Sequence, residues 1–207
     1  MKNPWEIVQL DDYENHMALP NVGQLQALSQ IMKRQFNQYH IQTVAIWGVA
    51  GGNGLEHIKP KQFKKIYGID INQAYLHNCR EKYADLREDL ICEVIDLTQI
   101  DCILPKVELI VANLLIEYIG IETFTKQVLK VHPKYVSCVI QKNIDKQFVS
   151  DSPYIKVFDD ISVLHQDIDE ESLKDSMHRE GYKHILRRVE GLPNGKQFIR
   201  LDFRLEG

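Results

Sequence analysis

Apolar residues follow two alternating patterns through most of the chain. In some segments they recur every three or four positions, which is typical of an amphipathic helix, and in others they form short continuous runs, which suit parallel strands covered on both faces. The helical spacing predicts helices beginning near Pro20, after Asp70 and at Ile121. Residues 1–20 are polar with little periodic apolar surface, so we expect them to be irregular. The continuous runs predict five strands, at Thr43–Trp47, Lys65–Ile69, Leu90–Ile95, Glu108–Ala112 and Tyr135–Ile140.

The last part of the chain predicts a different arrangement. Asp169 is a suitable N-cap for a helix that ends at Gly181. Two apolar segments, Tyr182–Val189 and Gln197–Phe203, then flank the turn signal at 192–195, which predicts an antiparallel hairpin. Five parallel strands followed by this hairpin predict an α/β protein with a sheet of seven strands. The hairpin is expected to supply the one antiparallel pairing.

Composition is that of a compact globular protein with one domain. The chain has 207 residues, and its 25 basic and 29 acidic residues give a formal net charge of −4. No basic tract is present, which argues against binding of duplex nucleic acid. The four cysteines have no C-x-x-C spacing, so we expect buried thiols and no metal site. Because the sequence shows neither a leader peptide nor a membrane-spanning run, we expect a cytoplasmic protein with no membrane partner.

A glycine-rich turn and three polar residues carry the candidate chemistry. Four glycines lie between Gly48 and Gly54, directly after the first predicted strand, and a helix is expected to begin at Asn53–Gly54. Glycine lets the backbone approach a ligand closely, and the N–H groups of a helix start attract anions. Asp70, Asp96 and Asn113 follow the next three strands. Because the carboxyl ends of parallel strands meet at one edge of a sheet, these positions predict a nucleoside-cofactor site.

Each of these residues also has a simpler interpretation. A glycine-rich turn occurs wherever a strand turns sharply into a helix, and Asp70 is suited to cap a helix beginning at Ile71. Asp96 is equally explained as a loop residue, and Asn113 as the end of its strand. The ligand-site interpretation is favoured because all four features fall at successive strand ends.

The order of strands, glycine turn and strand-end residues resembles the class I S-adenosylmethionine-dependent methyltransferases, from about Thr43 to the C-terminus. The resemblance implies a Rossmann-like, doubly wound sheet and S-adenosylmethionine as the cofactor. It also implies that residues 1–40 form an N-terminal lid segment and a helix packed on a cofactor-binding domain of residues 41–207. The cofactor-binding residues that the resemblance implies are Gly48, Val49, Ala50, Gly52, Asp70, Ile71, Asp96, Leu97 and Asn113.

The resemblance assigns a separate part of the cofactor to each strand end. Asp70 would accept hydrogen bonds from both ribose hydroxyls, and Ile71 would pack on the adenine. Asp96 would accept the adenine amine, with the Leu97 N–H near a ring nitrogen. The carbonyl of Asn113 would receive the methionine ammonium.

Two positions depart from the family pattern. Ile46 stands where the family usually has an acid, which removes one partner of the loop or of the cofactor ammonium. Ala50 stands at the middle glycine position, where alanine is tolerated if its φ is negative. These departures leave open a methyltransferase-fold module that binds the cofactor without catalysis. A nicotinamide-dependent oxidoreductase is a further alternative, although Gly48–Asn53 does not fit the G-x-G-x-x-G pattern.

The methyl acceptor is expected beyond the fourth strand. Glu117 and Tyr118 lie there, and Glu117 would act as a base or bind a cationic acceptor; the alternative for Glu117 is a solvated residue in the first turn of a helix. Tyr13 and His16 are the residues of the N-terminal segment expected to contact the acceptor as part of a lid; the alternative is that this segment simply wraps around the core. The run after the fourth strand lacks the Asn-Pro-Pro-Tyr motif of adenine and glutamine methylases. This argues against those two classes, while the composition and the absence of basic patches favour a small-molecule acceptor.

Overall fold

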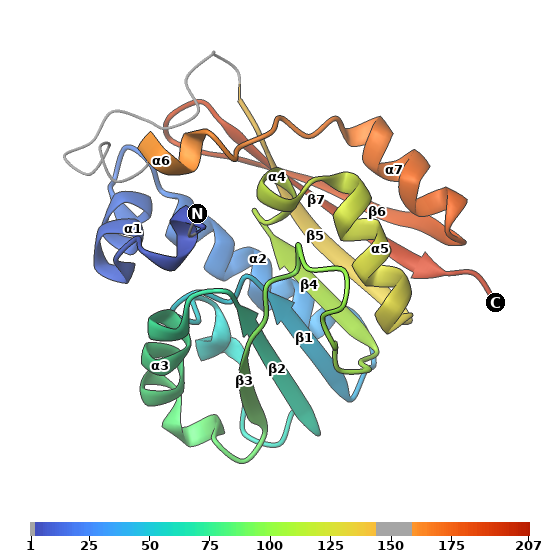
Figure 1. Cartoon of the computed structure of the whole chain (residues 1–207), viewed down its shortest axis with the longest axis horizontal. Helices are drawn as coiled ribbons and strands as arrows, with labels where there is room; N and C mark the ends of the chain where they lie inside the picture. The colour runs from blue at the N-terminus through green and yellow to red at the C-terminus, as the bar shows by residue number, and fades with distance from the viewer. Residues whose placement is uncertain (1–2, 144–158) are drawn as a thin grey trace.

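The computed structural model describes residues 3–143 and 159–207. Seven strands form one sheet in the order β3-β2-β1-β4-β5-β7-β6 (Figure 1). Strands β1 to β5 pair in parallel, so the five-stranded parallel sheet expected from the sequence is confirmed. The strands are β1 (Thr43–Trp47), β2 (Lys65–Asp70), β3 (Leu90–Val94), β4 (Leu109–Asn113), β5 (Tyr135–Lys142), β6 (Tyr182–Gly191) and β7 (Gln197–Leu205).

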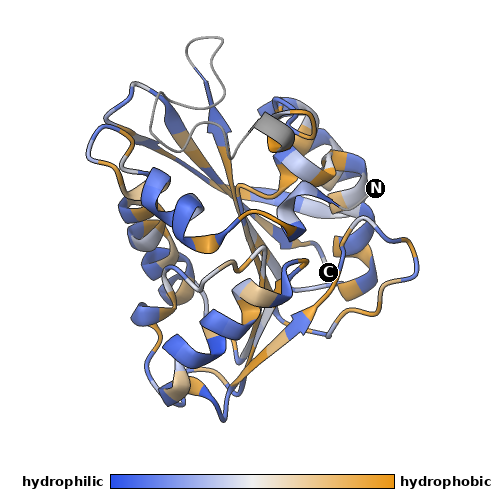
Figure 2. Ribbon diagram, turned by 60° about the vertical axis from the view of Figure 1, so that its left-hand side comes forward, coloured by the Kyte–Doolittle hydropathy of each residue, from blue (hydrophilic) through white to orange (hydrophobic). Residues whose placement is uncertain are grey.

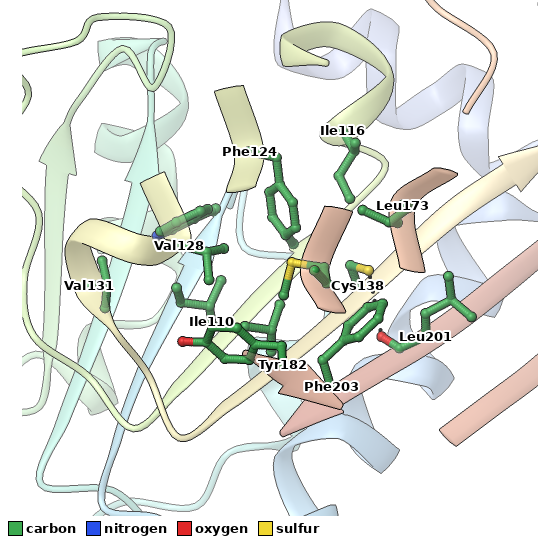
Figure 3. Close-up of a cluster of buried hydrophobic side chains, with 14 of the residues drawn as sticks. Ile110, Ile116, Phe124, Val128, Val131, Cys138, Leu173, Tyr182, Leu201 and Phe203 are labelled. Carbon is green, nitrogen blue, oxygen red and sulfur yellow. Dashed lines mark hydrogen bonds between the residues drawn. The ribbon is translucent and has the colours of Figure 1, made fainter. Parts of the chain in front are cut away.

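Helices cover both faces of the sheet. On one face, α2 (Gln24–Gln38) and α3 (Gln73–Lys82) contribute side chains to a buried cluster with alternate residues of β1, β2 and β4. On the other face, α5 (Ile121–Val131) and α7 (Glu170–Arg179) enclose a second cluster, part of which is drawn in Figure 3. Burial on both faces explains why the parallel strands have almost continuous apolar sequences.

The helices are amphipathic, as the spacing of their apolar residues predicts. In Figure 2 they carry both hydrophilic and hydrophobic stretches, as expected of helices that cover a sheet with one side. Phe124 and Val128 of α5 are fully buried, and Asp169 caps α7 by accepting a hydrogen bond from the Ser172 N–H. Within the described residues, no helix is long and apolar enough to cross a membrane.

The C-terminal hairpin joins the sheet through its second strand. β7 lies between β5 and β6 and runs antiparallel to both. The prediction of a single antiparallel pairing is therefore wrong, because the hairpin has inserted its more apolar strand beside β5. β6 becomes the edge, and its charged residues Lys183, Arg187 and Arg188 suit an exposed edge strand.

The N-terminal segment is helical, so the expectation of an irregular segment is wrong. A short 3-10 helix, η1 (Pro4–Glu6), is followed by α1 (Leu10–Ala18). Asn3 and Glu6 form a capping box around η1. Val8, His16 and Met17 are buried, so this segment contributes to the core more than its sequence pattern indicates.

The connection after the glycine turn also differs from the prediction. In place of a full helix, only the 3-10 helix η2 (Leu55–His57) follows the turn, since few residues separate it from β2 and Pro60 interrupts them. A further 3-10 helix, η3 (Ala84–Leu86), follows α3, and two short helices, α4 (Ile116–Ile119) and α6 (Asp159–Ser162), flank the carboxyl edge of the sheet.

The cap of α3 is Asn72 rather than Asp70. The Asn72 side chain accepts hydrogen bonds from the N–H groups of Ala74 and Tyr75, and the helix begins at Gln73. Asp70 is therefore available for another role at the end of β2.

Candidate functional site

A cavity lies at the carboxyl edge of the parallel strands, where β1 and β4 are neighbours and the chain changes direction across the sheet. It encloses about 760 Å³, including the part that opens to solvent. Several predicted residues lie on its wall, namely Gly48, Ala50, Asp70, Ile71, Asp96, Leu97, Asn113, Tyr13 and Tyr118. Val49, Gly52, Glu117 and His16 do not line it.

Asp70 closes the glycine turn onto β2. One of its carboxylate oxygens accepts the Ala50 N–H at 2.9 Å, and the other accepts the Asn72 N–H at 2.9 Å. Burial raises the pKa of Asp70, while these N–H groups act to lower it. The two oxygens have about four lone pairs between them, so the carboxylate keeps acceptor capacity for a ligand hydroxyl in the cavity.

The glycine turn is stabilised by hydrogen bonds to the neighbouring strand. Gly48 and Val49 donate their N–H groups to the carbonyl of Ile69. Ala50 has φ of 47°, so the condition under which alanine is tolerated without strain at this position is not met; the hydrogen bond to Asp70 holds the left-handed conformation.

Gly52 and Gly51 serve packing more than ligand contact. A Cβ on Gly52 would lie 2.6 Å from the Tyr83 ring and 2.8 Å from the Cys79 sulfur, so glycine lets the turn pack on α3. A Cβ on Gly51 would lie 2.5 Å from a carboxylate oxygen of Glu14. Helix α1 therefore packs directly on the glycine turn, a contact that the sequence pattern did not predict.

Asp96 supplies a second carboxylate to the cavity. Its oxygens accept the N–H and hydroxyl of Thr98 and the side-chain amide of Gln99. Burial raises the pKa of Asp96, but these hydrogen bonds outweigh that effect and lower it. Asp96 is therefore held as an oriented anion, able to accept a hydrogen bond from an amine. Ile71 and Leu97 form the apolar wall on this side.

Asn113 ends β4 at the opposite side of the cavity. Its side-chain amide exchanges two hydrogen bonds with that of Gln35 in α2, each 2.9 Å long. The chain turns sharply at the next residue, Leu114, where φ is 54°. Gln35 was not predicted from the sequence, because nothing local indicates that α2 reaches this strand end.

Three aromatic side chains cover the cavity near β4. The Trp5 ring meets the rings of Tyr13 and Tyr118 edge-on, with centroid separations of 5.5 and 4.9 Å. Asn72 donates its side-chain amide to the main-chain carbonyl of Trp5 at 2.9 Å, which fixes η1 beside the end of β2. Trp5 was not predicted, although the capping residues Asn3 and Glu6 around Pro4–Trp5 were a usable signal for an ordered segment.

Glu117 and His16 are buried and do not line the cavity. Glu117 is 2% exposed, so its interpretation as a solvated helix residue is wrong. One carboxyl oxygen accepts the Gln141 N–H at 2.8 Å, and burial raises the pKa of Glu117 to about 7. Burial and the charge of Lys196 lower the pKa of His16.

Within the part of the chain that the structure describes, no group of three or more histidine, cysteine, aspartate or glutamate side chains is arranged to hold a metal ion. The ligand groups of the cavity are instead the carboxylates of Asp70 and Asp96, the backbone of the glycine turn, and apolar and aromatic side chains. This combination suits a molecule that has a diol, an amine and a flat apolar ring.

No family model matches the sequence, and no curated protein matches it significantly. Solved methyltransferase structures do match the fold. Magnesium protoporphyrin IX methyltransferase from Synechocystis PCC 6803, with bound S-adenosylhomocysteine (SAH), has a TM-score of 0.68 at 10% identity, covering 98% of this chain and 96% of that chain. The N-methyltransferase NodS from Bradyrhizobium japonicum, also with SAH, has a TM-score of 0.66 at 11% identity, and both chains are covered completely, at 100%.

A third similar structure is an S-adenosylmethionine-dependent methyltransferase from Clostridium acetobutylicum. Its TM-score is 0.58 at 17% identity, over 89% of this chain and 92% of that chain. At these identities the similarity concerns the fold, and the strand order with its C-terminal hairpin agrees with it. This chain has the fold of the class I S-adenosylmethionine-dependent methyltransferases.

Proposed function

We propose that this protein is an S-adenosylmethionine-dependent methyltransferase that acts on a small-molecule acceptor. The observation that carries the proposal is the Asp70 carboxylate, fixed by Ala50 and Asn72 on the wall of a cavity that also holds the glycine turn and Asn113. In this proposal residues 41–207 bind the cofactor, and residues 1–40 form a cover and a helix packed on that core.

The residues fit the parts of the cofactor in order along the cavity. Asp70 would accept hydrogen bonds from the ribose hydroxyls, Asp96 would accept one from the adenine amine, and Ile71 would pack on the adenine ring; all three line the cavity. Asn113 would receive the methionine end. When bound, S-adenosylmethionine supplies a methyl group activated by its sulfonium. The protein aligns the acceptor with that group and excludes water.

Ile46 has a structural reason for replacing an acid. It is buried in the cluster formed with Met32 and Phe36 of α2, where a carboxylate would have to be desolvated. Asp70 and Asp96, the carboxylates that line the cavity, are assigned to the ribose and the adenine and do not replace this acid. The labelling experiment below therefore decides between the enzyme and the module that binds the cofactor without catalysis.

The small-molecule acceptor is supported by two observations. The aromatic side chains Trp5, Tyr13 and Tyr118 reduce access to the cavity beside β4, which suits an acceptor that is enclosed on binding. Among proteins of similar fold, two are named for small-molecule substrates, magnesium protoporphyrin IX and geranyl diphosphate.

The first test is cofactor binding by the purified protein. We expect saturable binding of S-adenosylmethionine and of SAH in calorimetric titrations, and no saturable binding of NAD. Incubation with methyl-labelled cofactor and a fractionated metabolite extract should then transfer label to a small molecule. Binding of NAD without binding of SAH would contradict the methyltransferase proposal. Binding of SAH without labelling of any fraction would favour the module that binds the cofactor without catalysis.

A second test separates the acceptor side from the cofactor side of the cavity. Tyr118→Ala removes the ring that packs against Trp5, and it is expected to lower turnover by about tenfold or more because acceptor alignment is lost. Tyr118→Phe retains the ring and is the matched control, with turnover expected within about threefold of the wild type. Titration with SAH checks that cofactor affinity is unchanged in both variants. A parallel loss of SAH affinity in Tyr118→Ala would place Tyr118 in the cofactor site.

A further inference from the structure

A continuous series of hydrogen bonds connects the wall of the cavity with a buried ion pair. Asn113 pairs with Gln35, and Gln35 also donates to the Ser137 hydroxyl at 2.9 Å. Ser137 donates to Asp202 at 2.5 Å, and Asp202 pairs with Arg200 through two hydrogen bonds of 2.8 and 2.5 Å. The series therefore runs from β4 through α2 and β5 to β7.

Burying this ion pair costs desolvation free energy. Arg200 is 2% exposed and Asp202 is fully buried. Removing both charges from water offsets most of their attraction, and apolar residues of similar size often stabilise a core equally well. Tyr39, at the end of α2, adds a hydrogen bond of 2.7 Å from its hydroxyl to Asp202. Because stability alone does not account for this network, we consider which neighbouring residues it holds in place.

Asn113, the residue of the network that lies on the cavity wall, is followed by a strained turn. Leu114 adopts φ of 54°, a left-handed conformation that is unfavourable for a side chain without a local reason. Its N–H donates to the Val139 carbonyl at 2.8 Å, and both Asn113 and Leu114 line the cavity. Such strain persists only where the surrounding structure over-determines it, and it is concentrated at functional sites.

We infer that Gln35 is a positioning residue of the cofactor site. Through Asn113 it holds the turn at Leu114 in the shape that receives the amino-acid end of the cofactor, and Ser137 and the ion pair hold Gln35 itself. The inference rests on the proposed function, because it assigns a binding role to the Asn113 side of the same cavity. Helix α2 would then contribute to cofactor binding through Gln35, in addition to covering the sheet.

The test compares two substitutions in α2 that break different hydrogen bonds. Gln35→Met preserves side-chain length but removes the pair with Asn113, so the SAH dissociation constant is expected to rise by about tenfold. Gln24→Met makes the same change in the same helix but removes a hydrogen bond to the Gln141 side chain, which lies outside the series, and is the matched control, with SAH affinity expected within about twofold of the wild type. Affinity is measured by calorimetry well below the Tm of each variant, and the Tm of each is recorded.

The outcomes distinguish this inference from the proposed function. Wild-type protein that does not bind SAH would overturn both. Wild-type protein that binds SAH, with Gln35→Met unchanged in affinity or with Gln24→Met equally weakened at a similar Tm, would overturn only the positioning role.

A second substitution keeps the inference testable should Gln35→Met fail to fold. Asn113→Ala breaks the same pair from the strand side and is expected to weaken SAH binding by a similar factor. The double variant is expected to be no weaker than the weaker single variant, because both changes remove one contact. Additive losses would show that Asn113 and Gln35 act independently, and would contradict the inference.

Discussion

Replacement of Asp70 by alanine is expected to weaken SAH binding by about a hundredfold or more. Each hydrogen bond between a ribose hydroxyl and a carboxylate contributes about 1.5–3 kcal/mol, and the proposal assigns two such bonds to Asp70. A loss of about 1.4 kcal/mol corresponds to a tenfold change in the dissociation constant. Asp70 also accepts the N–H groups of Ala50 and Asn72, so its removal leaves the glycine turn less fixed. Calorimetric titration with SAH measures the effect.

Asp70→Asn is the matched control for this substitution. Asparagine has nearly the same shape and keeps one acceptor oxygen, so we expect an affinity between those of the wild type and of Asp70→Ala. Because both variants disturb the hydrogen bonds of the turn, binding is compared at a temperature where circular dichroism shows each to be folded. SAH affinity within about a factor of two of the wild type in Asp70→Ala would show that Asp70 does not bind the ribose.

The strands could be predicted because their sequence signal is independent of distant contacts. The run Thr43–Trp47 coincides with β1, and the other parallel strands begin or end within two residues of their predicted bounds. Burial on both faces requires continuous apolar residues, and few other arrangements require them. The polar residues at the strand ends were informative for the same reason, since a parallel sheet places those ends along one edge.

The N-terminal helix could not be predicted, because its stability depends on tertiary contacts. Helix α1 is only 9 residues long, and an isolated helix of this length is unstable in water. It is stabilised where Leu10 and Glu14 pack on Gly51 and where Met17 enters the core. The residues Leu10, Tyr13 and Met17 do recur at helical spacing, but the acids and the histidine between them obscured the pattern.

The candidate site was predicted where it uses residues near strand ends and missed where it uses distant partners. Asp70, Asp96 and Asn113 all lie on the cavity wall. Gln35 is 78 positions from Asn113 and Trp5 is 67 positions from Asn72, so no local pattern connects them. The burial of Glu117 was missed because a glutamate in the first turn of a helix is usually solvated. Here the helix is the short α4, and Glu117 is enclosed against β5.

Glu117→Gln is expected to make the protein more stable at alkaline pH. Burial raises the pKa of Glu117 from 4.5 to about 7 in the folded protein, so the folded state holds a proton that the unfolded state has released. The contribution of Glu117 to the free energy of unfolding is complete below about pH 4.5 and is lost as the pH rises through about 7. The change amounts to about 3 kcal/mol, and glutamine, which does not ionise, avoids it while retaining an acceptor for the Gln141 N–H.

Urea unfolding between about pH 4 and pH 8 measures this effect. The difference in free energy of unfolding between Glu117→Gln and the wild type should grow with pH and level off above about pH 7. Burial also raises the pKa values of Glu14 and Asp70, but these groups are the same in both proteins, so the difference isolates Glu117. Glu122→Gln, an exposed residue of α5 paired with Lys126, is the control, and it should not gain stability with rising pH. A constant difference between Glu117→Gln and the wild type across this range would mean that Glu117 ionises equally in the folded and unfolded states, and would contradict the prediction.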